Sequence, residues 1–473
     1  MTRRLACAVA AAALAATAVV AAPDDDPLGE RTGGATTVDA TGRNAFSFPL
    51  ANLGDQERTR FVIGNSFFRR NWVEAPASTT ARDGLGPHFI ARSCGGCHVQ
   101  DGRGAPPDFR KGLVEQPVAL LMRLSVPGTA DPQHGIVPEP TYGDQFTNAA
   151  VQGVPPEGRI TLRWHDRPGR FADGTRYTLR EPRYGFAALA HGPMARDVLV
   201  SPRIAPQLIG VGLLESIPEA EIVRNAAEQG AAPGPIKGRP NRVWDHFAER
   251  EMLGRFGWKA NVATIAHQTA GAFLGDMGIT SSRLPRQSCT AAQRECLAAA
   301  HGGPRSGGPE IDDKTLADVV FYQATLAPPA RRAATDVQVL RGQTLFAAAQ
   351  CAACHRPSYV TAEGPFPRLT SKALQGQRIW PYTDLLLHDM GPALADHRPD
   401  FQASGRQWKT PPLWGVGVIR DVNGHQRLLH DGRARGVLEA VLWHGGEAEA
   451  SKQQVLKMSR AEREALVKFV ESL

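Results

Sequence analysis

Cysteine and long apolar runs are both scarce in this chain. Only seven of the 473 residues are cysteine. No second pair of cysteines lies at zinc-finger spacing from another, which argues against a structural zinc site. Beyond the first 22 residues, no run approaches the roughly 18 apolar residues that a transmembrane helix needs. The mature chain is therefore expected to have no membrane span.

Positive charge is not concentrated anywhere in the sequence either. The formal net charge is +7, yet Lys and Arg are spread along the chain. A nucleic-acid-binding protein would show a basic stripe or patch, so no nucleic-acid partner is expected. A diffuse positive surface would instead steer an acidic redox partner by long-range attraction.

One pentapeptide pattern is present twice, as CGGCH at Cys94–His98 and as CAACH at Cys351–His355. Cys-x-x-Cys-His is the attachment pattern of c-type haem. Two thiols at this spacing reach the two vinyl groups of one porphyrin, and the imidazole that follows binds the iron as proximal ligand. Composition alone predicts roughly 0.003 such pentapeptides in the chain. We therefore predict two covalent haem c groups, attached through Cys94, Cys97, Cys351 and Cys354, with His98 and His355 as iron ligands.

A Cys-x-x-Cys pair can also be a redox-active dithiol or half of a zinc site. A redox-active dithiol needs only the two cysteines, and half of a zinc site needs a second ligand pair. Neither calls for a histidine directly after both pairs, so both are disfavoured.

Residues 1–22 have the pattern of a secretory signal peptide. Arg3 and Arg4 form a positive n-region, residues 5–20 an Ala-, Val- and Leu-rich h-region, and small residues precede an acidic run that begins at Asp24. An uncleaved anchor is the alternative. We expect a bacterial protein that is periplasmic or secreted.

Two cysteines belong to neither pentapeptide nor signal peptide. These are Cys289 and Cys296, seven positions apart. Because an exported protein enters an oxidising compartment, a local disulfide is the expected state. Two free buried thiols are the alternative.

Periodicity and composition divide the remaining chain into three parts. Residues 23–45 are Asp-, Gly- and Thr-rich without apolar periodicity, which predicts a flexible segment. Residues 46–330 contain the first pentapeptide and many Gly and Pro, which predicts a haem domain enlarged by a loop-rich insertion with some short strands. In residues 331–473, one helix precedes Cys351, and a capping box at Ser459 begins a terminal amphipathic helix. This is the layout of a cytochrome c domain.

An internal echo indicates that the two halves are related. The pattern Pro-x-Leu-x-Gly-Val-Gly occurs at residues 206–212 and again at residues 411–417. It lies farther after His98 than after His355, so the first half carries the insertion. The predicted fold is mainly α, with two cytochrome c-like haem domains.

Several longer stretches add to the two pentapeptides. They are residues 201–206 (SPRIAP), 254–260 (GRFGWKA), 276–280 (DMGIT), 381–391 (PYTDLLLHDMG), 408–415 (WKTPPLWG), 429–434 (LHDGRA) and 443–448 (WHGGEA). Together they resemble the bacterial di-haem oxidoreductases, also labelled thiol oxidoreductases. That family is related to the di-haem cytochrome c peroxidases and to the di-haem enzyme that matures tryptophan tryptophylquinone.

The resemblance implies a di-haem oxidoreductase that is peroxidase-like. One haem would transfer electrons with a small redox protein, and the other would react with an oxidant or substrate. By analogy with the di-haem peroxidases, a calcium ion is a further expected cofactor. The distal glutamate of those peroxidases has no counterpart that can be identified here, so an electron carrier without catalysis is the alternative function.

The sixth ligands of the irons are less constrained by sequence. Met390 is the prediction for the second haem, with His388 of the same stretch as runner-up, and Met277 is the prediction for the first. A methionine packed in the core is the alternative at both positions. His430 and His444 are candidate ligands or haem-edge groups.

The reactive centre is predicted to be the haem of Cys94, Cys97 and His98, because its sixth ligand is hard to find by spacing. Trp258 and Trp414 belong to the quoted stretches. They would either bridge the haems electronically or simply pack against porphyrin.

Overall fold

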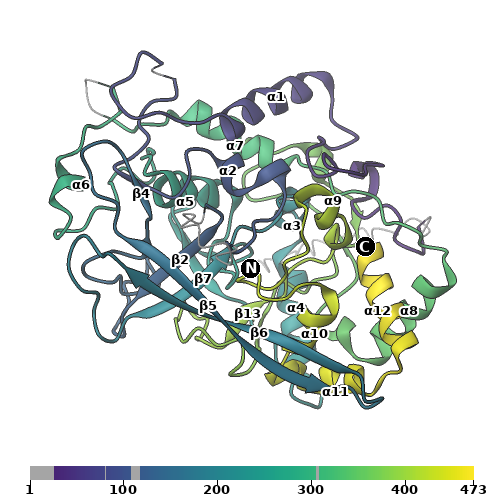
Figure 1. Ribbon diagram of the computed structural model, residues 1–473. Helices are drawn as coiled ribbons and strands as arrows, with labels where there is room; N and C mark the ends of the chain where they lie inside the picture. Colours follow the sequence, from purple (N-terminus) through teal and green to yellow (C-terminus); the bar gives the residue numbers. More distant parts are fainter. Residues whose placement is uncertain (1–25, 80, 108–117, 305–307) are drawn as a thin grey trace, which may run out of the picture.

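The computed structural model describes residues 26–79, 81–107, 118–304 and 308–473 (Figure 1). The predicted signal peptide, residues 1–22, lies outside the described residues. Among the described residues, helix accounts for 30% and strand for 18%. Helix is the larger share, but the strand content exceeds what a mainly α fold implies.

The twelve α-helices of the described residues are α1 (Asp55–Arg69), α2 (Cys94–Cys97), α3 (Val211–Glu215), α4 (Glu219–Ala231), α5 (Ile265–Met277), α6 (Arg294–Ala298), α7 (Asp313–Ala324), α8 (Val337–Ala348), α9 (Ile419–Asn423), α10 (Val437–Trp443), α11 (Glu449–Lys457) and α12 (Arg460–Ser472).

The strands in the first half are β1 (His88–Phe89), β2 (Leu120–Ser125), β3 (Gln145–Phe146), β4 (Ala149–Ala150), β5 (Arg159–Arg170), β6 (Arg176–Ala187), β7 (Leu199–Ile204), β8 (Arg242–Asp245) and β9 (Arg250–Leu253). Those in the second half are β10 (Tyr359–Val360), β11 (Arg378–Ile379), β12 (Leu387–Asp389) and β13 (Gln407–Lys409).

Two helix pairs cross in the same way, one in each half of the chain. Helix α1 packs on α7, and α8 packs on α12. A glycine stands at each crossing, because a Cβ at Gly64 would overlap the carbonyl oxygen of Asp318, and a Cβ at Gly342 would overlap that of Ala465. A phenylalanine four residues after each glycine, Phe68 or Phe346, is buried in the adjoining core.

Gly342→Ala is expected to destabilise the second half of the protein. The added methyl group must push α8 away from the α12 backbone, and overpacking of this kind costs roughly 1 to 3 kcal/mol. Denaturant unfolding measures the loss. Gly230→Ala is the matched control, because Gly230 lies in a helix with open space around it. Gly376→Ala is unsuitable, because the backbone φ of +68° at Gly376 disfavours alanine. Equal stability of Gly342→Ala and wild type would contradict the tight crossing.

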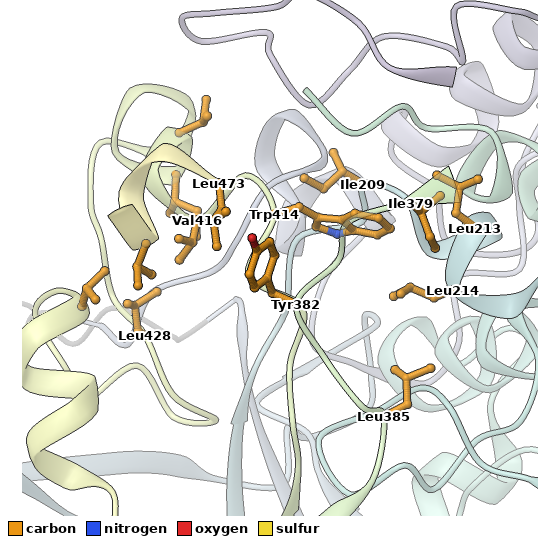
Figure 2. Close-up of a cluster of buried hydrophobic side chains, with 14 of the residues drawn as sticks. Ile209, Leu213, Leu214, Ile379, Tyr382, Leu385, Trp414, Val416, Leu428 and Leu473 are labelled. Carbon is orange, nitrogen blue, oxygen red and sulfur yellow. The ribbon is translucent and has the colours of Figure 1, made fainter. Parts of the chain in front are cut away.

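The internal echo of the sequence corresponds to a reciprocal contact between the halves. A Cβ at Gly210 would overlap the Trp414 ring, and a Cβ at Gly415 would overlap the Ile209 side chain. Figure 2 shows Ile209 and Trp414 side by side, with Leu213 and Ile379 beyond them. The two copies of the Pro-x-Leu-x-Gly-Val-Gly pattern therefore pack against each other.

The strands are mostly antiparallel pairs, and one of them is long. A three-stranded sheet has the order β3-β2-β7, while β5 and β6 form a hairpin of twelve residues on each side. The prediction of short strands is wrong for this hairpin. Its tip packs on the end of the chain, where Ala172 N–H donates to the Leu456 carbonyl at 2.9 Å and Arg463 pairs with Asp173 at 2.8 Å. Figure 1 shows the hairpin reaching across to α11 and α12.

The largest apolar core takes residues from both sides of the predicted boundary at residue 330. Phe46, Leu213, Trp414 and Leu473 all belong to it. The start of the described chain is also packed. Thr32 is buried and donates its hydroxyl to the Pro329 carbonyl at 2.6 Å. Residues 26–45 thus contrast with the flexible segment that composition predicts, because their partners lie about 300 residues away.

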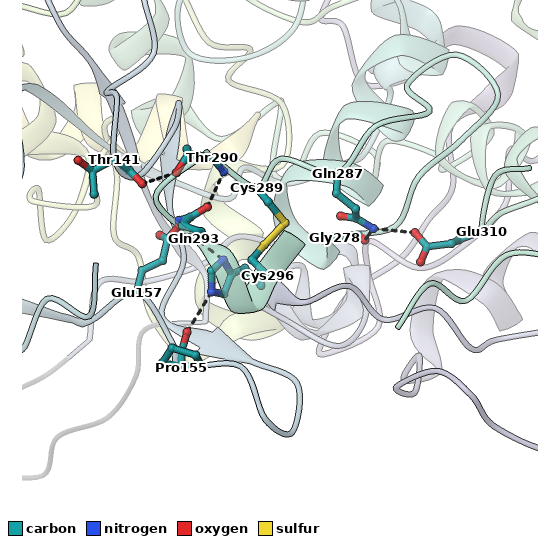
Figure 3. Close-up of a disulfide and its surroundings, with 11 residues drawn as sticks. Thr141, Pro155, Glu157, Gly278, Gln287, Cys289, Thr290, Gln293, Cys296 and Glu310 are labelled. Carbon is teal, nitrogen blue, oxygen red and sulfur yellow. Dashed lines mark hydrogen bonds and ion pairs between the residues drawn. A yellow bond between two sulfur atoms is a disulfide. The ribbon is translucent and has the colours of Figure 1, made fainter. Parts of the chain in front are cut away.

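The disulfide between Cys289 and Cys296 is confirmed (Figure 3). Gln293 lies inside its short loop and donates from Nε2 to Glu157 Oε1 at 2.5 Å. Burial raises the pKa of Glu157 to about 8. The loop therefore fastens α6 to the first half's buried polar groups.

Candidate functional site

The second pentapeptide forms one wall of an apolar cavity. Helix α8 ends at Ala348, Gln350 adopts a left-handed φ of 60°, and a short 3-10 helix follows at Cys351–Ala353. Cys351, Cys354 and His355 all line the cavity. The apolar part of the lining includes Phe346, Leu394, Leu413, Val416, Leu428, Val437, Val441, Leu466 and Val470.

His355 is held as a neutral ring that is oriented by the backbone. Its Nδ1 lies 3.0 Å from the Tyr382 carbonyl oxygen, which fixes Nδ1 as the protonated nitrogen and leaves Nε2 with its lone pair. Burial lowers the pKa of His355 to about 4. A neutral imidazole with a free Nε2 is what an iron ligand requires.

His98 has the same anchor in the first half. Its Nδ1 lies 2.8 Å from the Pro206 carbonyl oxygen, and burial lowers its pKa. The Phe68 ring stands 6.3 Å from the His98 ring, as the Phe346 ring stands 6.2 Å from His355. Both pentapeptides therefore present an equivalent histidine beside an equivalent phenylalanine.

A buried carboxylate lies close to His98 and bonds to a tyrosine whose counterpart in the second half is a phenylalanine. Asp101 is fully buried at a left-handed φ of 58°. It accepts a hydrogen bond from the Tyr322 hydroxyl at 2.6 Å and pairs with Arg69 at 2.6 Å. In the second half, Phe469 packs on Phe346 as Tyr322 packs on Phe68. The first site thus has a tyrosine bonded to its carboxylate where the second has a phenylalanine, and the buried carboxylate near His355, Asp384, pairs with His388 instead.

Met390 and His444 line the same cavity as His355. His444 follows α10 directly, and its Nδ1 lies 2.6 Å from the Ala440 carbonyl oxygen, which leaves Nε2 free. A charge on His444 would lower the pKa of His355, so the two rings are near each other. The predicted Met390 is thus at the cavity, but His444 has the anchoring that the two proximal histidines share.

His388, the runner-up ligand, is engaged by two carboxylates. Its Nε2 lies 2.8 Å from Asp384 Oδ2 and its Nδ1 lies 2.7 Å from Glu447 Oε2. These partners raise its pKa well above the usual value despite burial. With both ring nitrogens occupied, His388 is a buried imidazolium and has no lone pair for iron.

His388→Asn is expected to lower the free energy of unfolding by roughly 3 to 5 kcal/mol, because it leaves buried Asp384 without its cation. The ring's pKa is raised in the folded state, so its contribution is complete below about pH 6.5 and declines as pH rises toward the folded pKa. Denaturant unfolding at several pH values measures both effects. The exposed His165→Asn is the control, and a variant loss that grows with pH would contradict the assignment.

Met277 lies in a core cluster with Phe68, the residue beside His98. It is only 2% exposed and is the last residue of α5, which packs on α7. His444 likewise follows the end of a helix, α10, that packs on α12. Met277 and His444 therefore hold corresponding places in the two halves.

The two quoted tryptophans differ in position. Trp258 lines the cavity and donates from Nε1 to the Ile204 carbonyl at 2.8 Å. Trp414 is fully buried where the halves meet. A third, Trp408, stacks on His430 with ring centroids 3.7 Å apart. Trp408, Lys409 and Arg103 also line the cavity. The stretch 408–415 contains Trp408 and Lys409, but sequence reasoning assigned no role to them, and it did not single out Arg103.

Comparison with known proteins gives one family match. The model described as "Di-haem oxidoreductase, putative peroxidase" matches residues 28–170 and 187–473. The chain belongs to this di-haem oxidoreductase family. The unmatched residues between the two segments fall in β6 and the tip of the long hairpin.

No curated protein matches the chain. Among solved structures, hydrazine synthase of Kuenenia stuttgartiensis under xenon pressure is 15% identical with a TM-score of 0.23. That match covers 39% of this chain and 63% of the synthase chain, less than two thirds of its length. A TM-score this low does not establish a shared fold.

Membership in a di-haem family implies haem cofactors, and the residues present fit them. Each site offers a cysteine pair and a neutral, anchored histidine, and the second adds a large apolar cavity. A separate set, Cys354, Asp384 and His388, has ligand atoms within 4.8 Å of one another. Calcium prefers oxygen ligands, so this set does not test the calcium ion, which stays a prediction. In the part of the chain that is described, no helix is both long and apolar enough to cross a membrane.

Proposed function

We propose that the protein is a periplasmic di-haem c-type oxidoreductase. Its second haem transfers electrons, and its first reacts with an oxidant or substrate. The observation that carries the proposal is the pair of Cys-x-x-Cys-His sites whose histidines are both anchored through Nδ1 to a backbone carbonyl. This arrangement fixes the tautomer that binds iron, and a redox dithiol or zinc half-site has no need of it.

The lining of the second cavity supports electron transfer at that site. No Asp or Glu is among its lining residues. Cleavage of an oxidant requires a group that moves a proton near the iron, and the histidine best placed there, His444, has its Nδ1 proton on the Ala440 carbonyl. Met390 or His444 would complete the coordination of the iron and close it to substrate.

The surroundings of His98 support the first haem as the reactive centre. The Asp101 carboxylate is fully buried three residues after His98, and it accepts bonds from Tyr322 and Arg69. A fixed negative charge close to the iron favours the more oxidised state of the site. The second site has phenylalanine in the place of Tyr322, and its buried carboxylate, Asp384, is paired with the His388 cation.

The chain's own contributions are positional. Haem supplies the one-electron chemistry when it is bound. The carbonyls of Pro206 and Tyr382 orient the rings of His98 and His355, which would bind the irons. Trp414, packed against Gly210 where the halves meet, would either bridge the haems electronically or pack against porphyrin. A small redox protein would supply or accept the electrons.

Spectra of the ferric protein test the proposal against the non-catalytic carrier. The enzyme is expected to show one high-spin or ligand-exchangeable iron, whose spectrum changes on addition of cyanide or peroxide. Two low-spin centres that ignore both reagents would establish the carrier instead. The same preparation gives the mass of the mature protein, which should begin after residue 22 if the signal peptide is cleaved.

A further inference from the structure

Cations line the second haem cavity, and carboxylates do not. Among its described lining residues are Arg103, Lys409 and Lys452, but no Asp or Glu. Lys452 has its own partner, because its Nζ lies 2.6 Å from Glu449 Oε2. Arg103 and Lys409 have no carboxylate partner among the residues that the structure describes. The cavity therefore carries positive charge that the protein itself does not neutralise.

Lys409 is the clearest case of an unmatched charge. It is only 9% exposed, and it lies in β13 with its backbone N–H on the Trp258 carbonyl at 2.9 Å. Within the described part of the chain, its Nζ has no hydrogen-bond or ion-pair partner. Burial alone lowers its pKa to about 8. An isolated buried ammonium costs several kcal/mol.

A neighbouring lysine shows how this protein satisfies a buried ammonium when no ligand is involved. Lys259 Nζ lies 2.8 Å from Asp396 Oδ1 and also donates to the carbonyls of Arg398 and Ser404. Lys259 stands over one face of Trp408, 4.6 Å from the ring centroid. Lys409, which follows Trp408 in the chain, has none of these partners. The difference points to a ligand for Lys409.

Arg103 reaches the same region from the first half. Its Nε donates to the Arg427 carbonyl at 2.6 Å, and a second nitrogen donates to the Leu429 carbonyl. Its guanidinium stands 5.0 Å from the centroid of the Trp258 ring. Carbonyls orient this cation without cancelling its charge. Arg103 and Lys409 are therefore two buried cations of one cavity, and Trp258 meets the guanidinium of the first and the backbone of the second.

We propose that Lys409 and Arg103 bind the two propionate carboxylates of the second haem. This rests on the proposed function, since it assigns residues to the haem of Cys351 and Cys354. The porphyrin face needs apolar walls, which Phe346, Leu466 and Val470 provide, and its two carboxylates need cations. Arg103 lies five residues after His98, so this contact ties the second haem to the segment that carries the first.

A small inorganic or organic anion from solution would satisfy the same cations. The two sources differ in their dependence on added anion. A propionate is covalently part of the haem, so its contact with Lys409 is independent of anion concentration. The occupancy of a free anion would rise and fall with its concentration.

Lys409→Met in the di-haem protein tests the assignment. Both haems should stay attached, and the midpoint potential of the second haem should shift downward, because loss of a nearby cation favours ferric iron. The resonance Raman propionate bending band of that haem should shift as well. Lys409→Arg should restore both values toward wild type, and exposed Lys457→Met should leave both unchanged.

Each other outcome has a definite meaning. Di-haem Lys409→Met with wild-type potential and Raman band overturns the inference and leaves the proposed function intact. A potential shift that follows added chloride or phosphate also overturns it, in favour of a free anion. Protein without covalent haem overturns the proposed function itself.

Wild-type protein provides a second test that does not depend on a variant folding. With ¹³C-labelled propionates, redox-difference infrared spectra should show a carboxylate band that moves as pH rises through the titration of Lys409. A carboxylate band that is constant across that range would contradict the contact with Lys409.

Discussion

Replacing Cys351 and Cys354 together with alanine should leave a protein with one covalent haem instead of two. Both thiols line the second cavity with His355, and the first pair lies in a separate helix, α2. Each pair is predicted to attach its own porphyrin, so loss of one pair should remove a whole cofactor. Intact-mass measurement after acid-acetone extraction should show wild type with two haems and this variant with one.

The matched control is Cys94→Ala with Cys97→Ala, which should also retain one haem, that of the second site. Cys289→Ala with Cys296→Ala provides a second control, because the disulfide pair is not predicted to hold haem and both haems should remain. Wild-type protein that loses all haem on extraction would contradict covalent attachment at both sites.

Replacing the sixth ligand of the second haem should convert that iron from low spin to high spin. The sequence predicts Met390, and the cavity contains both Met390 and His444. We expect the larger effect from His444→Ala, because the Ala440 carbonyl holds the ring with Nε2 free. Magnetic circular dichroism with redox titration of His444→Ala and Met390→Ala measures spin state and potential.

The two variants give opposite signatures. If His444 is the ligand, Met390→Ala stays low spin and no near-infrared methionine-to-iron band is present in wild type. If Met390 is the ligand, wild type shows that band, and Met390→Ala loses it with a fall in potential, since methionine ligation raises the potential. A low-spin second haem in both variants would place the ligand elsewhere in the chain.

His98→Gly complements these variants by testing the division of labour. It should abolish turnover of peroxide or substrate and leave the absorption bands of the second haem in place. Turnover that survives this change would transfer the chemistry to the second haem.

The prediction of the haem attachment sites and the confirmed prediction of the disulfide both rest on local sequence. A Cys-x-x-Cys-His pentapeptide contains every atom that bonds one haem except the sixth ligand, so a run of five residues is sufficient. Cys289 and Cys296 are likewise seven positions apart and close one short loop. The echo at residues 206–212 and 411–417 was visible in the sequence, and its two copies pack against each other in the fold.

The long hairpin was not predictable in the same way. Residues 159–187 contain charged residues on both strands, and eight of the twelve residues of β5 and four of the twelve of β6 are exposed, so apolar alternation is weak there. The packing of residues 26–45 was missed because their partners, such as Pro329, are far away in the chain. Local composition carries no information about such contacts.

By itself the sequence determined which thiols and histidines are predicted to attach the haems, because the pattern lies within five consecutive residues. Only the tertiary structure decided the surroundings of each iron. It paired His388 with Asp384 and Glu447, turned His444 into the cavity, and left Lys409 there without a partner among the described residues. The residues that line the cavity come from positions as far apart in the chain as Arg103 and Val470. Their charges and lone pairs depend on neighbours that only folding supplies.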